Sequence, residues 1–285
     1  MSATTREGHL AGPPSSEPLF HIDDLTVRYP SKDGKESSVL ALEGINLEVD
    51  RGEFVSVVGP SGCGKSTLLS SVAGLLTGFQ GKITIRGEQI SGPHPDVGVV
   101  FQEESTFPWR TVLRNVEFGL EMRGVPKGER RRKADDMLRM VGLQDFATRY
   151  PNQLSGGMKQ RVAIARTLVT EPDILLMDEP FGALDEQTRI VLGDELLRIQ
   201  RALGQTALLI THNIQEAIML SDRVVVLSAR PGRIKGIFEI DLPRERDSSL
   251  IASEEFTAIV GKIWSVLRDE SLKSFSQTDR TDQGE

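Results

Sequence analysis

The stretch Gly59-Pro60-Ser61-Gly62-Cys63-Gly64-Lys65-Ser66-Thr67 decides the fold, because it fits the pattern G-x-x-x-x-G-K-[ST]. It follows an apolar run over 54–58 and opens a segment of helical pattern over 65–77. Glycines allow successive backbone N–H groups to surround phosphate oxygens, and the helix N-terminus adds its dipole. Lys65 offers a positive charge to the phosphates, and Ser66 offers a hydroxyl to Mg²⁺. The stretch therefore predicts a nucleotide-phosphate site.

Short apolar runs elsewhere in the chain predict further strands that are buried on both faces. Helical patterns lie between most of them, which predicts an α/β fold with a mainly parallel sheet covered by helices. Before the glycine-rich stretch, apolar and polar residues alternate over 19–29 and 39–49, on either side of the polar segment 31–38, and this favours antiparallel strands. The buried runs are 54–58, 97–101, 174–177, 207–210 and 224–227.

The remaining segments predict one domain over 19–243 with additions at both ends. Strand signals stop between about 103 and 170, where helical periodicity predicts an inserted helical subdomain. Residues 1–18 are rich in Pro, Gly, Ser and Thr and predict a flexible tail. The extension 244–285 contains an amphipathic pattern over about 253–270, with Ser253 as its helix cap and frayed residues at the end. This helix either packs on the main domain or binds a partner.

Composition narrows the functional class. The 285 residues carry 34 Lys and Arg against 41 Asp and Glu, and the resulting net charge of −7 disfavours nucleic acid as the main partner. No uncharged stretch is apolar enough to cross a membrane, and the N-terminus lacks a signal-like apolar segment. We therefore expect a cytosolic chain, and a different polypeptide wherever a membrane has to be crossed. Cys63, the one cysteine, is either a thiol activated by the helix N-terminus or a small filler.

Polar residues follow three of the expected strands. Asp178 and Glu179 end the run Ile174-Leu-Leu-Met, Gln102 follows 97–101, and His212 comes shortly after 207–210. The carboxyl ends of parallel strands meet at one sheet edge, so these side chains are expected near the glycine-rich stretch. Asp178 suits a Mg²⁺ ligand, Glu179 suits a general base for an attacking water, Gln102 suits a contact to the metal or the water, and His212 suits a hydrogen bond to the γ-phosphate.

A second anion site is predicted at Leu154-Ser155-Gly156-Gly157-Met158. This segment begins a helix that we expect to run to about Thr170, with Ser155 as its N-cap. Free backbone donors, a serine hydroxyl and the helix dipole attract an anion there.

Together these segments resemble the ATP-binding subunit of ABC transporters, a P-loop NTPase family, over about residues 20–240. The resemblance implies an ATPase whose substrate is ATP with Mg²⁺, and implies two copies that meet head to tail, with ATP between the glycine loop of one and the LSGG segment of the other. It implies roles in nucleotide contact for Asp185, in Gly-Ala-Leu-Asp, and for Tyr29 as the aromatic that stacks on adenine. Tyr29 as a solvent-facing strand end is the alternative. Met158 departs from the Gln that many members carry, which leaves contacts across the dimer open.

The resemblance extends to importers of nitrate, sulfonate or taurine, through 107–120 (FPWRTVLRNVEFGL) and 229–234 (ARPGRI). It implies permease subunits in the membrane, a separate solute-binding protein outside it, and a peripheral place for this chain on the cytoplasmic face. Glu103-Glu-Ser105 is less like that branch. Trp109 either shapes the groove for the permease or lies in the core. A soluble ABC-type ATPase that acts as a nucleotide-gated clamp or assembly factor remains the alternative function.

Overall fold

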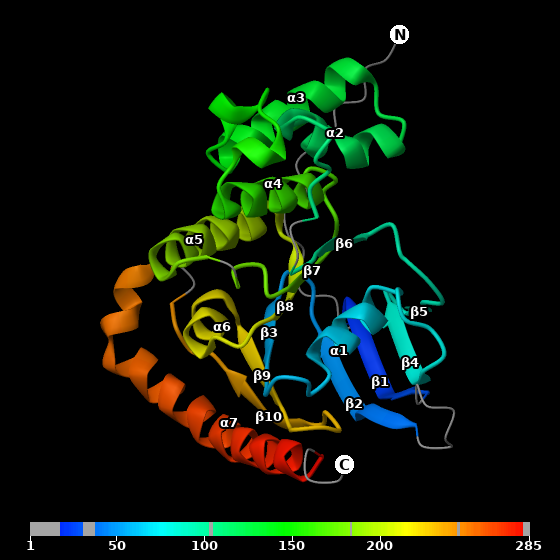
Figure 1. Ribbon diagram of the computed structural model, residues 1–285, viewed down its shortest axis with the longest axis vertical. Coiled ribbons are helices and arrows are strands. Elements are labelled where there is room, and N and C mark those ends of the chain that lie inside the picture. Colours follow the sequence, from blue (N-terminus) through cyan, green and yellow to red (C-terminus); the bar gives the residue numbers. More distant parts are fainter. Residues whose placement is uncertain (1–17, 31–37, 103–104, 183, 244–245, 282–285) are drawn as a thin grey trace.

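The computed structural model describes residues 18–30, 38–102, 105–182, 184–243 and 246–281, with side chains through residue 274. Residues 1–17 of the predicted tail over 1–18, most of the segment 31–38, and Glu103 and Glu104 lie outside the described residues. Within them, the chain folds into two sheets, a helical part at one end and a long C-terminal helix (Figure 1).

The larger sheet has the order β10-β9-β3-β8-β7-β6, and all its neighbours are parallel except β10 with β9. Its central strands are built from the short apolar runs and are buried along their whole length, as the sequence predicts. The strands are β3 (Phe54–Val58), β6 (Val97–Val100), β7 (Ile174–Asp178), β8 (Thr206–Ile210), β9 (Arg223–Leu227) and β10 (Ile234–Glu239).

The smaller sheet is antiparallel and has the order β2-β1-β4-β5 among the described residues. It confirms the two strands predicted before the glycine loop and adds a pair after it. The strands are β1 (Phe20–Tyr29), β2 (Val39–Val49), β4 (Gln80–Ile85) and β5 (Glu88–Gln89). Helix α1 (Lys65–Val72) lies between the two sheets and ends earlier than the predicted 77. Gly74 explains the early end, since its φ is +69° and a Cβ there would lie 2.1 Å from the Gly92 carbonyl oxygen.

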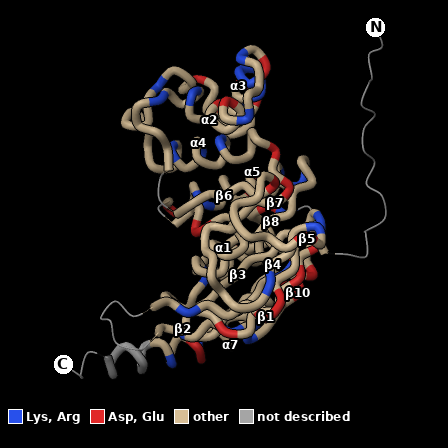
Figure 2. The backbone as a smooth tube through the Cα atoms, turned by 90° about the vertical axis from the view of Figure 1, so that its right-hand side faces the viewer, with Lys and Arg blue, Asp and Glu red and all other residues tan. Residues whose placement is uncertain are grey.

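Helices α2 (Val112–Met122), α3 (Lys127–Met140) and α4 (Gly156–Leu168) form the helical part. It stands at one end of the molecule, with the sheets at the other (Figure 2). Ala134, Met137 and Leu138 of α3 are buried, as their spacing predicts. Helix α5 (Glu186–Leu203) then packs with these helices on one face of the larger sheet.

Helix α7 (Glu254–Thr281) is longer than the predicted 253–270 and continues into the residues expected to fray. Ser253 begins it as predicted, with its hydroxyl 3.1 Å from the Phe256 amide that donates to it. Together with α6 (Ile214–Leu220), α7 covers the side of β9 and β10, and Phe256, Ile263 and Leu267 are buried there. The helix therefore packs on the main domain, which was one of its two readings.

Cys63 belongs to the apolar cluster between the two sheets and is only 1% exposed. Burial raises the pKa of its thiol above the ordinary 9.0, although the positive charge of Lys65 and a backbone N–H act in the opposite direction. The activated-thiol reading is therefore wrong, because the desolvation of a thiolate at this position outweighs the effect of the helix N-terminus. The side chain acts as a small filler.

Replacement of Phe256 by Ala is expected to lower the free energy of unfolding by about 3 to 5 kcal/mol, because it leaves a cavity beneath α7. Denaturant unfolding followed by circular dichroism measures this change. Trp264→Ala on the same helix is the matched control, since Trp264 is 52% exposed. Equal effects of the two substitutions would contradict the described packing of α7.

Cys63 is expected to react with a thiol reagent at pH 8 at least about tenfold more slowly in the folded protein than in denaturant, because the buried thiol keeps its proton. A time course of labelling reads this thiol alone, since the chain has one cysteine. Equal rates in the two conditions would contradict the buried position.

Candidate functional site

The parallel register of the larger sheet brings the predicted polar residues to one edge. Val57 of β3 and Asp178 of β7 both pair with Ile210, the last residue of β8. The next hydrogen bonds continue this alignment: the Glu179 amide donates to Ile210 O at 2.8 Å, and the Thr211 amide donates to Val57 O at 3.2 Å. The glycine loop, the carboxylates and His212 therefore all start from the same level of the sheet.

The glycine loop between β3 and α1 depends on glycine at two positions. Gly62 and Gly64 have φ values of +72° and +105°, the left-handed region that side chains rarely adopt. A Cβ on Gly64 would also lie 2.7 Å from Leu42 Cδ2 and 2.9 Å from Ala41 O. Strand β2 thus packs closely against the loop and leaves no room for a side chain at Gly64. The loop is tightly curved, and its backbone can approach a ligand closely.

Lys65 spans this curve. Its Nζ donates to Gly59 O at 2.9 Å and to Pro60 O at 3.0 Å, and the residue is only 8% exposed. Ser61, Gly62 and Ser66 are exposed beside it. A buried ammonium that is held by neutral carbonyls gains strongly from a phosphate brought close to it, because an ionic partner offsets its lost hydration.

Asp178 provides the fit for a metal ion. Its Oδ1 is buried and has no hydrogen-bond partner, while the Ser66 hydroxyl bonds to the carboxylate. Burial raises the pKa of Asp178, which Ser66 and the charge of Lys65 partly offset. A carboxylate and a hydroxyl are oxygen ligands that Mg²⁺ accepts. The described residues contain no cluster of three or more His, Cys, Asp or Glu side chains suited to a metal, so this pair fits an ion that takes its other ligands from phosphates and water.

Glu179 lies between the two other predicted residues. Gln102 Nε2 donates to its Oε2 over 3.4 Å, and His212 Nδ1 lies 3.1 Å from the same oxygen. These residues are far apart in the sequence, and the ends of β6, β7 and β8 bring them together. His212 is 59% exposed and Glu179 19%, so the carboxylate is half-shielded but open to water. The arrangement can hold a water molecule and take a proton from it.

The backbone at Glu179 is strained, with φ +43°. Such a conformation costs about 1 to 3 kcal/mol for a residue with a side chain. The chain turns back at once, since the Gly182 amide donates to Glu179 O at 3.0 Å. This turn directs the carboxylate across the strand ends towards Gln102 and His212.

Tyr29 ends β1 beside the glycine loop. Its hydroxyl lies 3.2 Å from Thr67 Oγ1, and the residue is 38% exposed. The side chain is therefore partly exposed next to the loop. The position combines the two readings of Tyr29, since the side chain is at a strand end and also next to the loop.

Ser155 caps α4 as predicted, with its Oγ accepting from the Met158 amide at 3.3 Å. Asp185 caps α5 in the same way, accepting from the Thr188 amide at 2.9 Å and from its hydroxyl at 2.7 Å. These two bonds from Thr188 lower the pKa of Asp185. The two caps are neighbours, because a Cβ on Gly157 would lie 3.3 Å from Thr188 Cγ2. Met158 is half-buried against the core.

The second anion site does not join the first within one chain. Gly156 and Gly157 begin α4 in the helical part, whereas Lys65 begins α1 between the sheets (Figure 1). The structure thus groups Tyr29, the glycine loop, Gln102, Asp178, Glu179 and His212, and leaves Ser155 to Gly157 and Asp185 in a separate group on the same chain.

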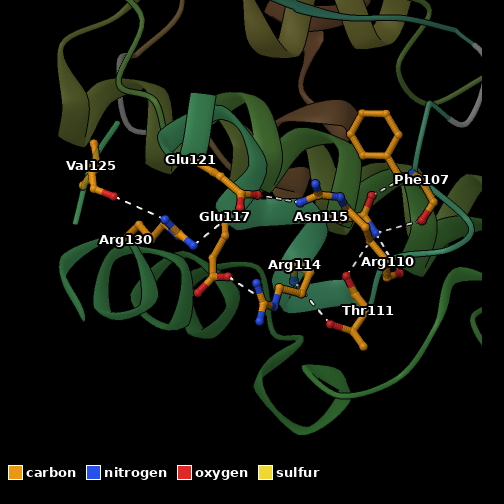
Figure 3. Close-up of polar contacts among 9 residues, drawn as sticks. All are labelled: Phe107, Arg110, Thr111, Arg114, Asn115, Glu117, Glu121, Val125 and Arg130. Atoms are coloured by element: carbon orange, nitrogen blue, oxygen red, sulfur yellow. Dashed lines mark hydrogen bonds and ion pairs between the residues drawn. The ribbon is translucent and has the colours of Figure 1, made fainter. Parts of the chain in front are cut away.

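A loop over 107–111 is held rigid in the helical part (Figure 3). The fully buried Asn115 accepts from the Phe107 amide at 2.7 Å and donates to the carbonyls of Phe107, Arg110 and Thr111 at 3.0 to 3.1 Å. An ion pair fixes Arg110, whose Nη1 lies 2.7 Å from Glu121 Oε2. Trp109 projects from this loop, 72% exposed and 5.6 Å from the Phe107 ring. The core reading of Trp109 is therefore wrong.

Two further groups beside the site were not expected from the sequence. Glu216 lies in the first turn of α6. Burial raises its pKa to about 7, although Arg189 and a hydrogen bond from Thr211 lower it. Arg230 donates from Nε to Gly62 O at 3.2 Å. The turn that carries it was noted as a motif, but its contact with the glycine loop depends on long-range packing.

Comparison with known proteins adds to this geometry. A profile described as "ABC transporter" matches residues 42–182. An uncharacterized ABC transporter ATP-binding protein of Methanocaldococcus jannaschii is 56% identical over 83% of this chain and 87% of its own length. The nitrate import ATP-binding protein NrtD of Synechocystis sp. is 51% identical over 75% of this chain and 81% of its own length. The bicarbonate transport ATP-binding protein CmpC of Synechococcus elongatus is 48% identical over 79% of this chain, which corresponds to 34% of its own length.

Among solved structures, a dimeric ATP-binding cassette in a post-hydrolysis state, bound to ADP and Pi, has a TM-score of 0.69 and 32% sequence identity. The match covers 79% of this chain and all of that one. The glycine loop, the carboxylates at the end of β7 and the cap of α4 all lie within the matched residues 42–182. On this evidence, the chain belongs to the family of ABC transporter ATP-binding proteins.

Proposed function

We propose that this chain hydrolyses ATP at the edge of the larger sheet and that it powers a membrane importer. The observation that carries the proposal is the convergence of Gln102 and His212 on the Glu179 carboxylate, at the strand ends that also carry the glycine loop. A general base needs this geometry, namely an oxygen that is held in place and remains accessible to water.

In this proposal the residues of the glycine loop, 59–67, bind the phosphates through their backbone N–H groups, and Lys65 turns its ammonium from the loop carbonyls to the phosphate oxygens. Tyr29 stacks on adenine, which is worth about 1 to 3 kcal/mol for a base on an aromatic ring. Glu179 takes the proton of the attacking water, while Gln102 and His212 orient the water and the γ-phosphate. Ser66 and Asp178, with Gln102 nearby, would hold Mg²⁺, which supplies charge neutralisation for the phosphates.

We further propose that two copies complete the site. Ser155, Gly156 and Gly157 offer free helix N–H groups, and they are exposed or half-buried. The separation of this group from the glycine loop within one chain supports a partner copy as its destination, with Asp185 next to it. ATP then favours the closed pair through contacts that form only in that state, and hydrolysis reverses the preference.

Permease subunits are the proposed membrane partner, and Trp109 is the proposed contact. No helix in the described part of the chain is long and apolar enough to span a membrane. An exposed tryptophan on a rigid loop is typical of an interface anchor, because its area is buried at low entropic cost. The chain would act at the cytoplasmic face of the membrane. A solute-binding protein outside the membrane would complete the system.

The proposed solute is nitrate, a sulfonate such as taurine, or a related small solute. The sequence segments 107–120 and 229–234 and the names of the relatives NrtD and CmpC support this class. Nitrate, sulfonates and bicarbonate share a small oxyanion group.

Glu179→Gln is expected to lower ATP hydrolysis by roughly 10²- to 10⁴-fold, the usual contribution of a general base, while ATP affinity changes little. Phosphate release and calorimetric titration of ATP measure the two effects. Glu255→Gln, an exposed position at the start of α7, is the control and should hydrolyse ATP normally. Normal turnover in Glu179→Gln would contradict the proposed base.

Trp109→Ala is expected to abolish recovery of a polytopic permease when the tagged chain is purified from detergent-solubilised native membranes, with ATP binding unchanged. Mass spectrometry of the purified complex provides the measurement, and Trp264→Ala is the matched control. Recovery of soluble partners alone by the wild-type chain would contradict the importer role and favour a clamp or an assembly factor.

A further inference from the structure

The turn over 228–232, between β9 and β10, packs directly against the glycine loop. A Cβ on Gly232 would lie 2.2 Å from Cys63 O, so the two backbones are in direct contact. Arg230 reaches over the same loop and donates from Nε to Gly62 O at 3.2 Å. Any shift of this turn must therefore move the loop or open a gap behind it.

The turn is itself a rigid unit. Ser228 Oγ lies 2.8 Å from Ala229 O and 2.7 Å from Pro231 O, and it accepts from the Arg233 amide at 2.9 Å. The Gly232 amide donates to Ala41 O at 2.9 Å, which ties the turn to β2. The amide of Ala229, a residue only 7% exposed, is a buried donor in this turn. Its acceptor comes from a different part of the chain.

That amide donates to Glu270 Oε2 of α7 at 3.1 Å. Glu270 is 5% exposed, and its other oxygen faces Lys273 at 2.7 Å and Lys235 at 3.8 Å. Burial acts to raise the pKa of Glu270, but the hydrogen bonds from Lys273 and Ala229 and the charges of both lysines lower it below its ordinary value. The carboxylate is therefore ionised at neutral pH and is a stronger acceptor than a neutral group.

These contacts form a continuous path from the C-terminal helix to the phosphate site. From the path we infer that Glu270 is a positioning residue for ATP binding: it fixes the turn 228–232 through Ala229, and the turn fixes the glycine loop through Arg230 and Gly232. The inference rests on the proposed ATPase function. The inference gives α7, which lies beyond the segment 42–182 matched by the family profile, an indirect part in nucleotide affinity.

The physical reason is preorganisation. The loop binds phosphate with backbone N–H groups, and their combined strength depends on all of them pointing at one place before the ligand arrives. Without Glu270 the Ala229 amide is left buried and unsatisfied, which the turn relieves by moving towards water. The glycine loop then loses its contact with the turn 228–232 and is less ordered before ATP binds.

Glu270→Ala in the full-length chain is expected to weaken ATP binding about tenfold, as measured by calorimetric titration of ATP, because one buried donor loses its charged acceptor. KM for ATP should rise in parallel, while kcat at saturating ATP stays within about twofold, since the Glu179 group is untouched. Glu270→Gln keeps an oxygen for the Ala229 amide and should restore most of the affinity.

Asp269→Ala is the matched control, because Asp269 is exposed and is the preceding residue on the same helix. It removes the same charge and should bind ATP normally. Phe256→Ala controls for loosening of α7, since it weakens the packing of the helix but keeps the carboxylate. A smaller loss of affinity in Phe256→Ala than in Glu270→Ala supports the specific role, and an equal loss would overturn it.

A double-mutant cycle with Arg230→Ala tests the path itself. If both residues act through the turn, the loss in the double variant is smaller than the product of the two single losses. Independent, multiplying effects would overturn the inference, as would an unchanged Kd in Glu270→Ala. Failure of the wild-type chain to bind ATP would instead contradict the proposed function, so the two failures are distinguishable.

Discussion

The parallel pairing of β7, β8 and β3 is the constraint on which the rest of the structure depends. It places Asp178 level with Ile210 and the start of the glycine loop next to them. The strands are buried along nearly their whole length, so a slip of one residue would exchange side chains between the two apolar clusters on the faces of the sheet and disrupt the packing of both. Core packing on this sheet thus determines the geometry of groups that have no direct contact with the core.

The larger sheet holds two energetically unfavourable groups of the site in place. Glu179 has a left-handed backbone and Lys65 is a buried cation on neutral carbonyls, and neither arrangement is favourable alone. Both become useful when phosphate and water occupy the strand ends. The same holds for the buried Asp178 Oδ1, which has no hydrogen-bond partner and would gain one from the proposed metal ion.

Much of the fold could be predicted from the sequence because its signals are local. The glycine loop, most of the buried apolar runs and the caps Ser155 and Ser253 each depend on a few adjacent residues, and they appear where they were expected. The run 97–101 is the exception: it forms the edge strand β6, in which only Val100 is buried, and Phe101 is exposed, so its predicted burial on both faces is wrong. The ends of α1 and α7 could not be predicted, because they depend on distant contacts: Gly92 lies against Gly74, and helix α7 packs on β9 and β10.

The candidate site also combines features with local sequence signals and features that depend on distant contacts. Gln102, Glu179 and His212 could be named from their positions after strands, but their meeting at one carboxylate oxygen required the sheet order. The exposure of Trp109 and the burial of Cys63 could not be inferred, since a tryptophan in an apolar segment and a cysteine in a glycine loop are each compatible with either environment. The hydrogen bond that links Glu270 to the turn 228–232 joins residues 41 positions apart and carries no sequence signature.

The central claim is that ATP binds between the glycine loop of one copy and the Ser155 segment of another. A crystal structure of the Glu179→Gln protein with ATP tests it most directly. The account predicts two nucleotides per pair of chains, each in contact with residues 59–67 of one chain and residues 155–157 of its partner. A nucleotide whose contacts all come from a single chain would contradict it.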